Sequence, residues 1–129
     1  MSELEQIRSA SAPEAIGPYS QAVRCGNIVF CSGQIPFDPV TRQLRNETIE
    51  DSTGQCLRNL QAVLSAAGCS ISDVIKTTVY MTDLKEFPAM NATYAAFFGT
   101  HKPARATVQV SALPAGARVE IDCVAAHGA

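Results

Sequence analysis

One arginine and one glutamate in the last quarter of the chain are the residues best suited to do chemistry. Arg105 and Glu120 are fifteen residues apart, each within a short run that has the composition of a β-strand. Pro114 and Gly116 between the two runs predict a turn, and a hairpin-like return would bring both side chains toward one site. An arginine binds a carboxylate through paired hydrogen bonds, and a glutamate nearby holds or activates a water molecule. Together they suggest a pocket that acts on a small acid.

The same two residues have a simpler interpretation, because charged side chains near strand ends are usually solvated surface groups. The surrounding pattern favours function instead. Pro103-Ala104-Arg105 is followed by a β-branched run, by Leu113-Pro114-Ala115-Gly116 and by Val119-Glu120-Ile121. This segment resembles the signature of the RidA/YjgF family, the reactive-intermediate (enamine/imine) deaminases.

Three further segments resemble patterns of that family and occur in the expected order. They are Gly17-Pro18-Tyr19-Ser20-Gln21-Ala22, Ser32-Gly33-Gln34-Ile35-Pro36 and Met90-Asn91-Ala92-Thr93-Tyr94. The resemblance runs over residues 12–126, which is nearly the whole chain. One short motif alone is weak, but four in register form a specific signal, so the chain is identified as a member of this family.

The resemblance implies a role for each site residue. Arg105 binds the substrate carboxylate, and Glu120 orients the attacking water and relays protons, for which a raised pKa would suit it. Further substrate-binding positions follow from the same comparison, and they are Tyr19, Ser32, Gly33, Asn91 and Thr107. Without the resemblance, Tyr19 is better explained as a packing residue and Asn91 as a cap or solvent-facing residue.

Thr107 is the position where this chain departs from the family, because many members have a cysteine there. The implied reaction needs no thiol nucleophile, and Thr107 still offers a hydroxyl and a backbone amide to a substrate oxygen. The substitution puts the substrate preference in doubt rather than the chemistry.

The implied reaction is the hydrolysis of 2-enamine and 2-imino acids, of the 2-aminoacrylate and 2-iminobutyrate type, to 2-keto acids and ammonia. The enzyme would be a 2-iminobutanoate/2-iminopropanoate deaminase that uses no metal or organic cofactor.

Two alternatives from other classes stay open, an RNA-cleaving or translation-inhibiting protein and a non-catalytic trimer that binds a small ligand. The net charge of −2 and the absence of tryptophan argue against a nucleic-acid groove.

Composition predicts one domain over residues 1–129, with residues 1–11 flexible. The N-terminus has two acidic residues and no apolar run, which indicates no secretory or transit signal, and no segment reaches the length of a membrane span.

The five cysteines lack a C-x-x-C pair, so we expect reduced core thiols in a cytoplasmic protein. Cys123 and His127, four residues apart, are only a weak metal-site candidate.

Periodicity predicts most of the elements. Residues 19–25 and 28–32 flank Gly26-Asn27 as a β-hairpin, and the second strand is apolar enough to be buried on both faces. A helical stripe over residues 51–67 starts after Thr48 and ends at Gly68. Residues 73–81 alternate as a strand, and a second helix follows from Pro88 to Gly99.

Two helices cover only one face of such a sheet, so the other face needs a partner and a homo-oligomer is expected. The resemblance implies more: an α+β, chorismate-mutase-like fold with a sheet of about six strands and two helices packed on one face. It also implies a homotrimer whose active clefts lie between subunits.

Overall fold

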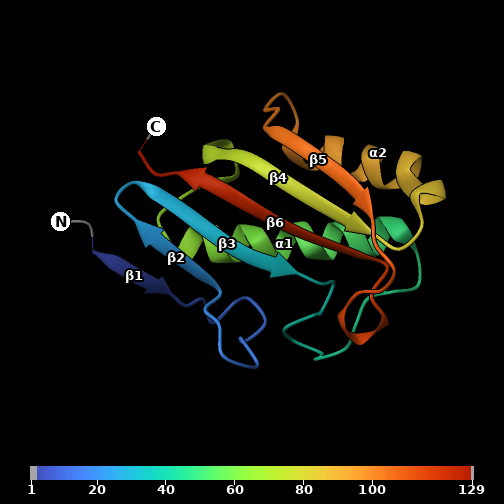
Figure 1. Cartoon of the computed structure of the whole chain (residues 1–129), viewed down its shortest axis with the longest axis horizontal. Helices are drawn as coiled ribbons and strands as arrows, with labels where there is room; N and C mark the ends of the chain where they lie inside the picture. The colour runs from blue at the N-terminus through green and yellow to red at the C-terminus, as the bar shows by residue number, and fades with distance from the viewer. Residues whose placement is uncertain (1–2, 129) are drawn as a thin grey trace.

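The computed structural model describes residues 3–128, in which six strands form one mixed sheet with two helices behind it (Figure 1). This is the expected α+β architecture with both helices on the same face. The strands are β1 (Leu4–Ile7), β2 (Ala22–Cys25), β3 (Ile28–Gln34), β4 (Val74–Met81), β5 (Ala104–Gln109) and β6 (Val119–Ala126). The helices are α1 (Ile49–Ala66) and α2 (Phe87–Phe98), and three short 3-10 turns precede β4, α2 and β6.

The hairpin of β2 and β3 confirms the prediction made from Gly26-Asn27. Gly26 takes a positive φ of 62°, which a tight turn between twisted strands requires and which glycine adopts without strain. The expectation that the second strand is buried on both faces is wrong for the single chain. Val29 and Cys31 are buried, but Phe30 between them is 53% exposed, because no helix covers its face of the sheet.

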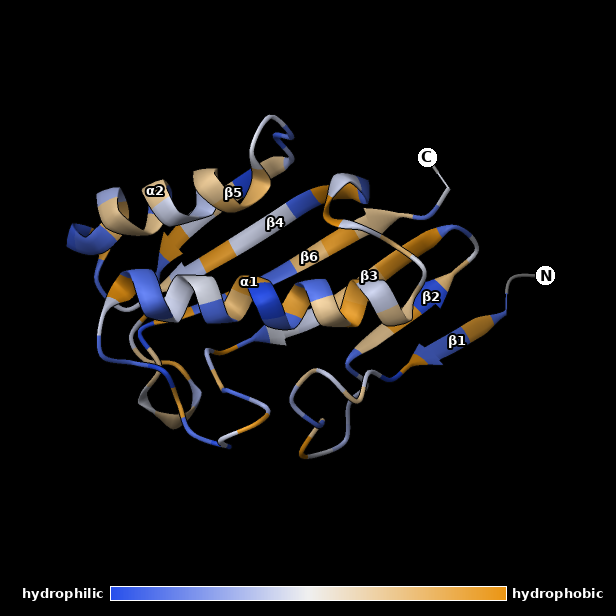
Figure 2. Cartoon of the chain, turned by 180° about the vertical axis from the view of Figure 1, so that it is seen from behind, coloured by the Kyte–Doolittle hydropathy of each residue, from blue (hydrophilic) through white to orange (hydrophobic). Residues whose placement is uncertain are grey.

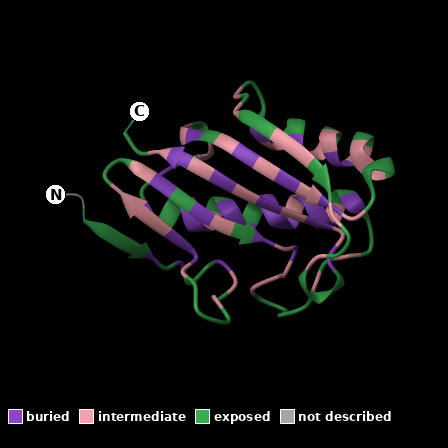
Figure 3. Cartoon of the chain, viewed as in Figure 1, coloured by how far each residue is buried: buried purple, intermediate pink, exposed green. Residues whose placement is uncertain are grey.

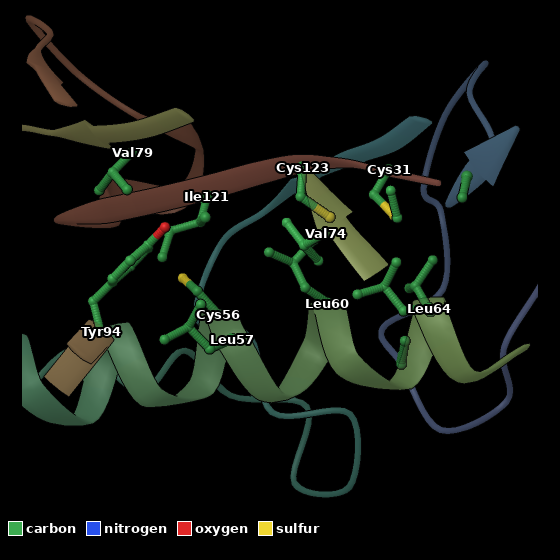
Figure 4. Packing of buried hydrophobic residues seen from close by; sticks show 14 of the residues in the cluster. Cys31, Cys56, Leu57, Leu60, Leu64, Val74, Val79, Tyr94, Ile121 and Cys123 are labelled. Carbon is green, nitrogen blue, oxygen red and sulfur yellow. The ribbon is translucent and has the colours of Figure 1, made fainter. Parts of the chain in front are cut away.

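Helix α1 forms where the apolar stripe predicted it and begins two residues earlier. The Thr48 side chain caps it by accepting a hydrogen bond of 3.1 Å from the Asp51 backbone N–H. Ala67 is the C-cap, and Gly68 follows it with a φ of 76°. The buried face of α1 packs Leu57, Leu60 and Leu64 against the sheet (Figure 4).

Strand β4 and helix α2 also form where the sequence predicted them. Helix α2 has a proline in its first turn and ends at Gly99, whose φ of 64° closes it. Its buried residues, Met90, Tyr94 and Phe98, recur every four positions and so face the sheet. The Tyr94 hydroxyl hydrogen-bonds the Thr77 hydroxyl of β4 at 2.7 Å, which fixes α2 on the sheet.

The strand order corrects one expectation. The sheet runs β1-β2-β3-β6-β4-β5, so β4 lies between the two strands that were expected to form a hairpin. Strand β5 pairs in parallel with β4, while β6 pairs antiparallel with both β4 and β3. The connection from β5 to β6 therefore passes over β4 at the end of the sheet rather than turning back beside β5 (Figure 1).

The core lies between the sheet and the two helices. Along β6 the buried residues alternate with half-buried ones, and the buried set points toward the helices. Figure 2 views the helical side, with α1 and α2 in front of the sheet. Figure 3 views the other side, where buried and partly exposed positions alternate along β4 and β6. That second face carries apolar side chains with no covering layer among residues 3–128, including Phe30, Val108 and Val124.

The N-terminal segment, expected to be flexible over residues 1–11, contains a strand in its described part, and residues 1–2 lie outside the described residues. Leu4–Ile7 forms β1, which pairs antiparallel with β2 at the edge of the sheet. Ile7 is buried there, although the strand is otherwise exposed. Over the described residues, neither helix combines the length and the apolar character that a bilayer crossing needs.

Candidate functional site

Arg105 is positioned by helix α2 and lies on the helical side of the sheet. Its Nη1 donates a hydrogen bond of 2.7 Å to Asn91 Oδ1. The guanidinium carbon is 4.7 Å from the centre of the Tyr94 ring and 5.5 Å from that of Phe87, distances at which a cation and an aromatic face attract. Arg105 is exposed, and no carboxylate among residues 3–128 lies within ion-pair distance of it. Its remaining N–H groups are thus available to an anionic ligand.

Thr107 lies on the same side of β5 as Arg105, two residues further along. In register it is opposite Val79, a fully buried residue of β4 that faces the helices. The Thr107 hydroxyl oxygen is buried and has no hydrogen-bond partner within the described chain. A buried hydroxyl without a partner is costly, so its position beside Arg105 is compatible with a ligand that would bond it.

Glu120 lies on the opposite, uncovered face of the sheet. Its neighbours Val119 and Ile121 are fully buried toward the helices, so the alternation of β6 turns Glu120 away from them, as predicted. The Glu120 carboxyl group rests on the backbone of Gly33. A Cβ at Gly33 would be 2.9 Å from the Glu120 carboxyl carbon and 3.1 Å from its Cγ. Glycine is therefore required at this contact for steric reasons.

A β-bulge creates the contact between Gly33 and Glu120. The pairing of β3 with β6 shifts between Cys31, opposite Cys123, and Gln34, opposite Ile121. The two residues between them, Ser32 and Gly33, face a single residue of β6. Bulges of this kind re-aim side chains next to functional sites.

The surroundings of Glu120 raise its pKa above the ordinary value of a glutamate. Burial is the larger cause, because it disfavours the charged form, and the nearby Asp122 carboxylate adds to it. Asp122 itself accepts a hydrogen bond of 3.1 Å from the Tyr80 hydroxyl. Burial and the charge of Asp122 raise the pKa of Tyr80 as well, so Tyr80 keeps its proton as a donor at neutral pH. Glu120 is thus a carboxyl group suited to exchanging protons.

A cavity of about 500 Å³ lies beside Gly33, and it brings Tyr19 to the same region. Its walls are mostly apolar and come from the segment before β2, from the residues after β3, and from the β5–β6 connection. The lining residues include Glu14, Ile16, Tyr19, Gly33, Arg42 and Ala115. The Tyr19 side chain is 53% exposed, and its hydroxyl accepts a long hydrogen bond of 3.4 Å from the Ile16 N–H.

Ser32 has a structural partner already. Its hydroxyl donates a hydrogen bond of 2.6 Å to the Ser20 carbonyl, and its backbone N–H donates to the Gln21 carbonyl at 2.9 Å. These two bonds tie the segment that carries Tyr19 to the end of β3. Ser32 therefore holds Tyr19 near Gly33, and its hydroxyl oxygen can still accept a hydrogen bond from a ligand.

The predicted site residues therefore fall into two groups on one chain. Arg105, Asn91 and Thr107 share the helical side of the sheet beside α2. Glu120 lies on the other face, over Gly33 and close to Ser32 and the cavity that Tyr19 lines. The expectation that a β5–β6 hairpin would bring Arg105 and Glu120 together is wrong, because β4 separates their strands and their side chains face opposite ways.

Sequence reasoning missed several residues that position these groups. Phe87 and Tyr94 hold the Arg105 guanidinium, and their signal was their spacing of four and three residues from Asn91 on one helix. Asp122 was missed although it follows Glu120 by two residues, which places both carboxylates on one face of β6. Arg42 in the cavity wall had no sequence signal, since its loop has no regular period.

His127, the histidine of the weak metal-site candidate with Cys123, contacts a different cysteine. His127 Nδ1 lies 3.7 Å from the sulfur of Cys69 instead. Among residues 3–128, no three or more histidine, cysteine or acidic side chains gather in a way that would hold a metal ion. All five cysteines are free thiols.

Comparison with known proteins identifies relatives over nearly the whole chain. A RutC family protein of Pyrococcus horikoshii is 50% identical over 94% of this chain and 96% of its own. The human protein named 2-iminobutanoate/2-iminopropanoate deaminase is 45% identical over 95% of this chain and 89% of its own.

Two solved structures are similar to this chain in both fold and sequence. The putative endoribonuclease L-PSP of Entamoeba histolytica superposes with a TM-score of 0.94 at 47% identity, covering 96% of this chain and 99% of that one. TdcF of E. coli, solved with bound serine, superposes with a TM-score of 0.92 at 41% identity, covering 96% and 99%. The family model described as endoribonuclease L-PSP matches residues 9–127. The chain therefore belongs to the endoribonuclease L-PSP family, which is the YjgF/RidA family.

Proposed function

We propose that this protein hydrolyses 2-imino acids, and the enamines that tautomerise to them, to 2-keto acids and ammonia. The observation that carries the proposal is the Arg105 guanidinium, which Asn91 and two aromatic rings hold in place while its other donors face solvent. An arginine oriented in this way is suited to a planar carboxylate. The deaminase name of the human relative, at 45% identity, supports the same substrate class.

In the proposed reaction Arg105 binds the substrate carboxylate and Glu120 holds a water molecule. Glu120 accepts a proton as the water oxygen bonds to the imine carbon, which gives a carbinolamine. Because the imine nitrogen is protonated when water attacks, Glu120 can return that first proton to the amino group of the carbinolamine. The C–N bond then breaks and ammonia leaves, while the now deprotonated Glu120 takes the remaining hydroxyl proton as the C=O bond forms. Burial and the charge of Asp122 raise the pKa of Glu120, which makes its carboxylate a stronger base toward the water and lets the carboxyl group serve as base and then as acid.

The proposal requires a second copy of the chain, because Arg105 and Glu120 lie on opposite sides of one sheet. We propose a homotrimer in which the Arg105 group of one subunit meets the Glu120 and Tyr19 group of its neighbour. The exposed Phe30 and Val108 on the uncovered face of the sheet give a second reason for assembly, since apolar side chains on a sheet face favour burial against another layer. Thr107 would then lie at the cleft with its unpartnered hydroxyl available to the substrate.

The cellular setting we propose is the cytoplasm. The five free thiols, four of them buried, suit a compartment that keeps cysteines reduced. The reaction as proposed uses only side chains of this protein and water.

The test is a coupled assay in which an amino-acid dehydratase generates the imine and semicarbazide traps what remains. Wild-type protein is expected to suppress trapping, whereas Arg105→Ala and Glu120→Ala are not. Unchanged trapping with every dehydratase substrate tried would reject the deaminase proposal.

The family description names an endoribonuclease, so RNA cleavage is the second candidate. The same protein preparations should be incubated with single-stranded RNA. Cleavage that persists in both variants would favour that candidate. Binding of a keto acid without any turnover of an imine would favour a ligand-binding protein instead.

A further inference from the structure

The cavity beside Gly33 contains a feature that the proposed reaction does not use. Arg42 and Ala115 are the two non-glycine residues with positive φ among residues 3–128, at 62° and 59°. They come from separate loops, and both line this one cavity. Residues other than glycine held in this conformation cost energy and cluster at ligand sites. Their shared location therefore points to a ligand in the cavity.

The loop that carries Arg42 is rigidly built. The Arg42 N–H donates to the Asp38 carbonyl at 2.8 Å, and the Asp38 N–H donates to the Gln43 carbonyl at 2.9 Å. Arg45 then pairs with Asp38 at 3.3 Å and with Asp51 of α1 at 3.2 Å, which anchors the loop to the helix. These contacts hold the backbone of Arg42 at its strained φ before a ligand arrives, and its exposed side chain lies in the cavity wall.

Arg42 is the charged residue of the cavity wall that has no partner of opposite charge among residues 3–128. The only other charged residue in its wall is Glu14, whose carboxylate already pairs with Arg8 at 3.1 Å. Within the part of the chain that the structure describes, Arg42 has no ion-pair partner. The rest of the wall is largely apolar, so a group bound there would bring an aliphatic stem and an anionic end.

We propose that this cavity binds the side chain of the substrate and that Arg42 recognises a second carboxylate on it, so that 2-imino dicarboxylic acids are substrates. The inference rests on the proposed function, because the reacting carbon would lie at Glu120, which is next to the cavity through Gly33. Arg105 binds the carboxylate beside the imine, and Arg42 binds the distal one. A cavity of about 500 Å³ has ample room for a five-carbon acid.

The test compares two imines, 2-iminoglutarate released by an amino-acid oxidase and 2-iminobutyrate released by a dehydratase, each trapped with semicarbazide. The measured quantity is the ratio of kcat/KM for the acidic imine over the uncharged one. Wild type is expected to favour the acidic imine, and Arg42→Asn to lower the ratio by about 10- to 100-fold, the value of a lost charged hydrogen bond. Asparagine tolerates positive φ, so the loop should keep its shape.

Two further variants sharpen the result. Arg42→Lys keeps the charge and should retain part of the preference, whereas Arg58→Ala removes an exposed cation from α1 and should leave the ratio at the wild-type value. A wild-type ratio at or below one, or a ratio unchanged in Arg42→Asn, would overturn the proposal.

Calorimetry with the keto acids separates this inference from the proposed function. If wild type hydrolyses neither imine, the deaminase proposal fails. The affinities for 2-ketoglutarate and 2-ketobutyrate then test on their own whether the cavity binds a second carboxylate. Tighter binding of 2-ketoglutarate that Arg42→Asn abolishes would support the subsite. Equal binding of the two keto acids would refute it.

Discussion

Arg105 and Glu120 lie on opposite faces of the same sheet. Strand β4 lies between their strands, and in register Arg105 is opposite Thr77 of β4 whereas Glu120 is opposite Tyr80. Thr77 faces the helices and Tyr80 faces away from them. One chain can therefore supply each residue to a cleft but not both to the same cleft. The proposed reaction makes assembly a condition of activity, which a mixing experiment tests.

Subunits with Arg105→Ala and subunits with Glu120→Ala should restore activity when refolded together. If each cleft takes Arg105 from one subunit and Glu120 from the next, a random equal mixture leaves about one cleft in four intact. We expect about one quarter of the wild-type activity from the mixture and almost none from either variant alone. A mixture as inactive as its parents would contradict a shared cleft.

Gly33→Ala should displace the Glu120 carboxyl group. The new Cβ would lie 2.9 Å from the Glu120 carboxyl carbon, so the side chain must move and kcat should fall by at least 10-fold. Overpacking at this contact should also cost about 1–3 kcal/mol of unfolding free energy. Steady-state kinetics and chemical denaturation measure the two effects.

The matched control for that change is Gly54→Ala on helix α1. It adds the same methyl group, which meets only the flexible Arg58 guanidinium at 3.1 Å. Because alanine is the better helix former, Gly54→Ala should stabilise by about 0.5–1 kcal/mol and keep wild-type kinetics. Full activity in Gly33→Ala would show that the position of Glu120 does not matter for turnover.

Asn91→Ala should loosen the Arg105 guanidinium. The variant loses the 2.7 Å hydrogen bond to Nη1, so the KM for the imino acid should rise about 10-fold while kcat changes little. Arg105→Lys should raise KM further, because an ammonium group lacks the planar pair of donors. The comparison of kcat and KM for the two variants checks this prediction. An unchanged KM in Asn91→Ala would argue against its positioning role.

Thr107→Val should raise the stability of the protein while weakening substrate binding. The Thr107 hydroxyl is buried without a partner, so replacing it with a methyl group of similar shape should stabilise the protein by about 1–2 kcal/mol. If the hydroxyl bonds the substrate in the cleft, KM should rise several-fold in the same variant. Higher stability with an unchanged KM would remove Thr107 from the site.

Glu120→Gln should be inactive in imine hydrolysis and more stable than wild type at neutral pH. Burial and Asp122 raise the folded-state pKa of Glu120, so its contribution to stability is fully present below the unfolded value, near 4.3, and is lost as pH rises through the folded pKa. The stability advantage of Glu120→Gln should therefore grow with pH across that window. Thermal denaturation from pH 4 to pH 8 measures it, with Glu47→Gln, an exposed loop carboxylate, as the control for loss of charge.

Local patterns were sufficient to predict most of the elements. The stripe of apolar residues in α1, the Thr48 cap and the Gly26-Asn27 turn each depend on residues near one another in sequence, which is why they could be predicted from it. The alternation of β6 likewise turned Glu120 away from the core as predicted. Phe30 was misplaced because its apolar run does not say which face of the sheet the helices cover.

The sequence by itself determined which residues are proposed for the site and most of the strands and helices that carry them. Only the tertiary structure decided how they are distributed: β4 enters between β5 and β6, and the bulge in β3 turns Gly33 toward Glu120. Strand order and bulges depend on pairing between distant segments, which no local period encodes. Arg42 lies in an irregular loop, so for the same reason only the tertiary structure shows that it is part of the cavity wall.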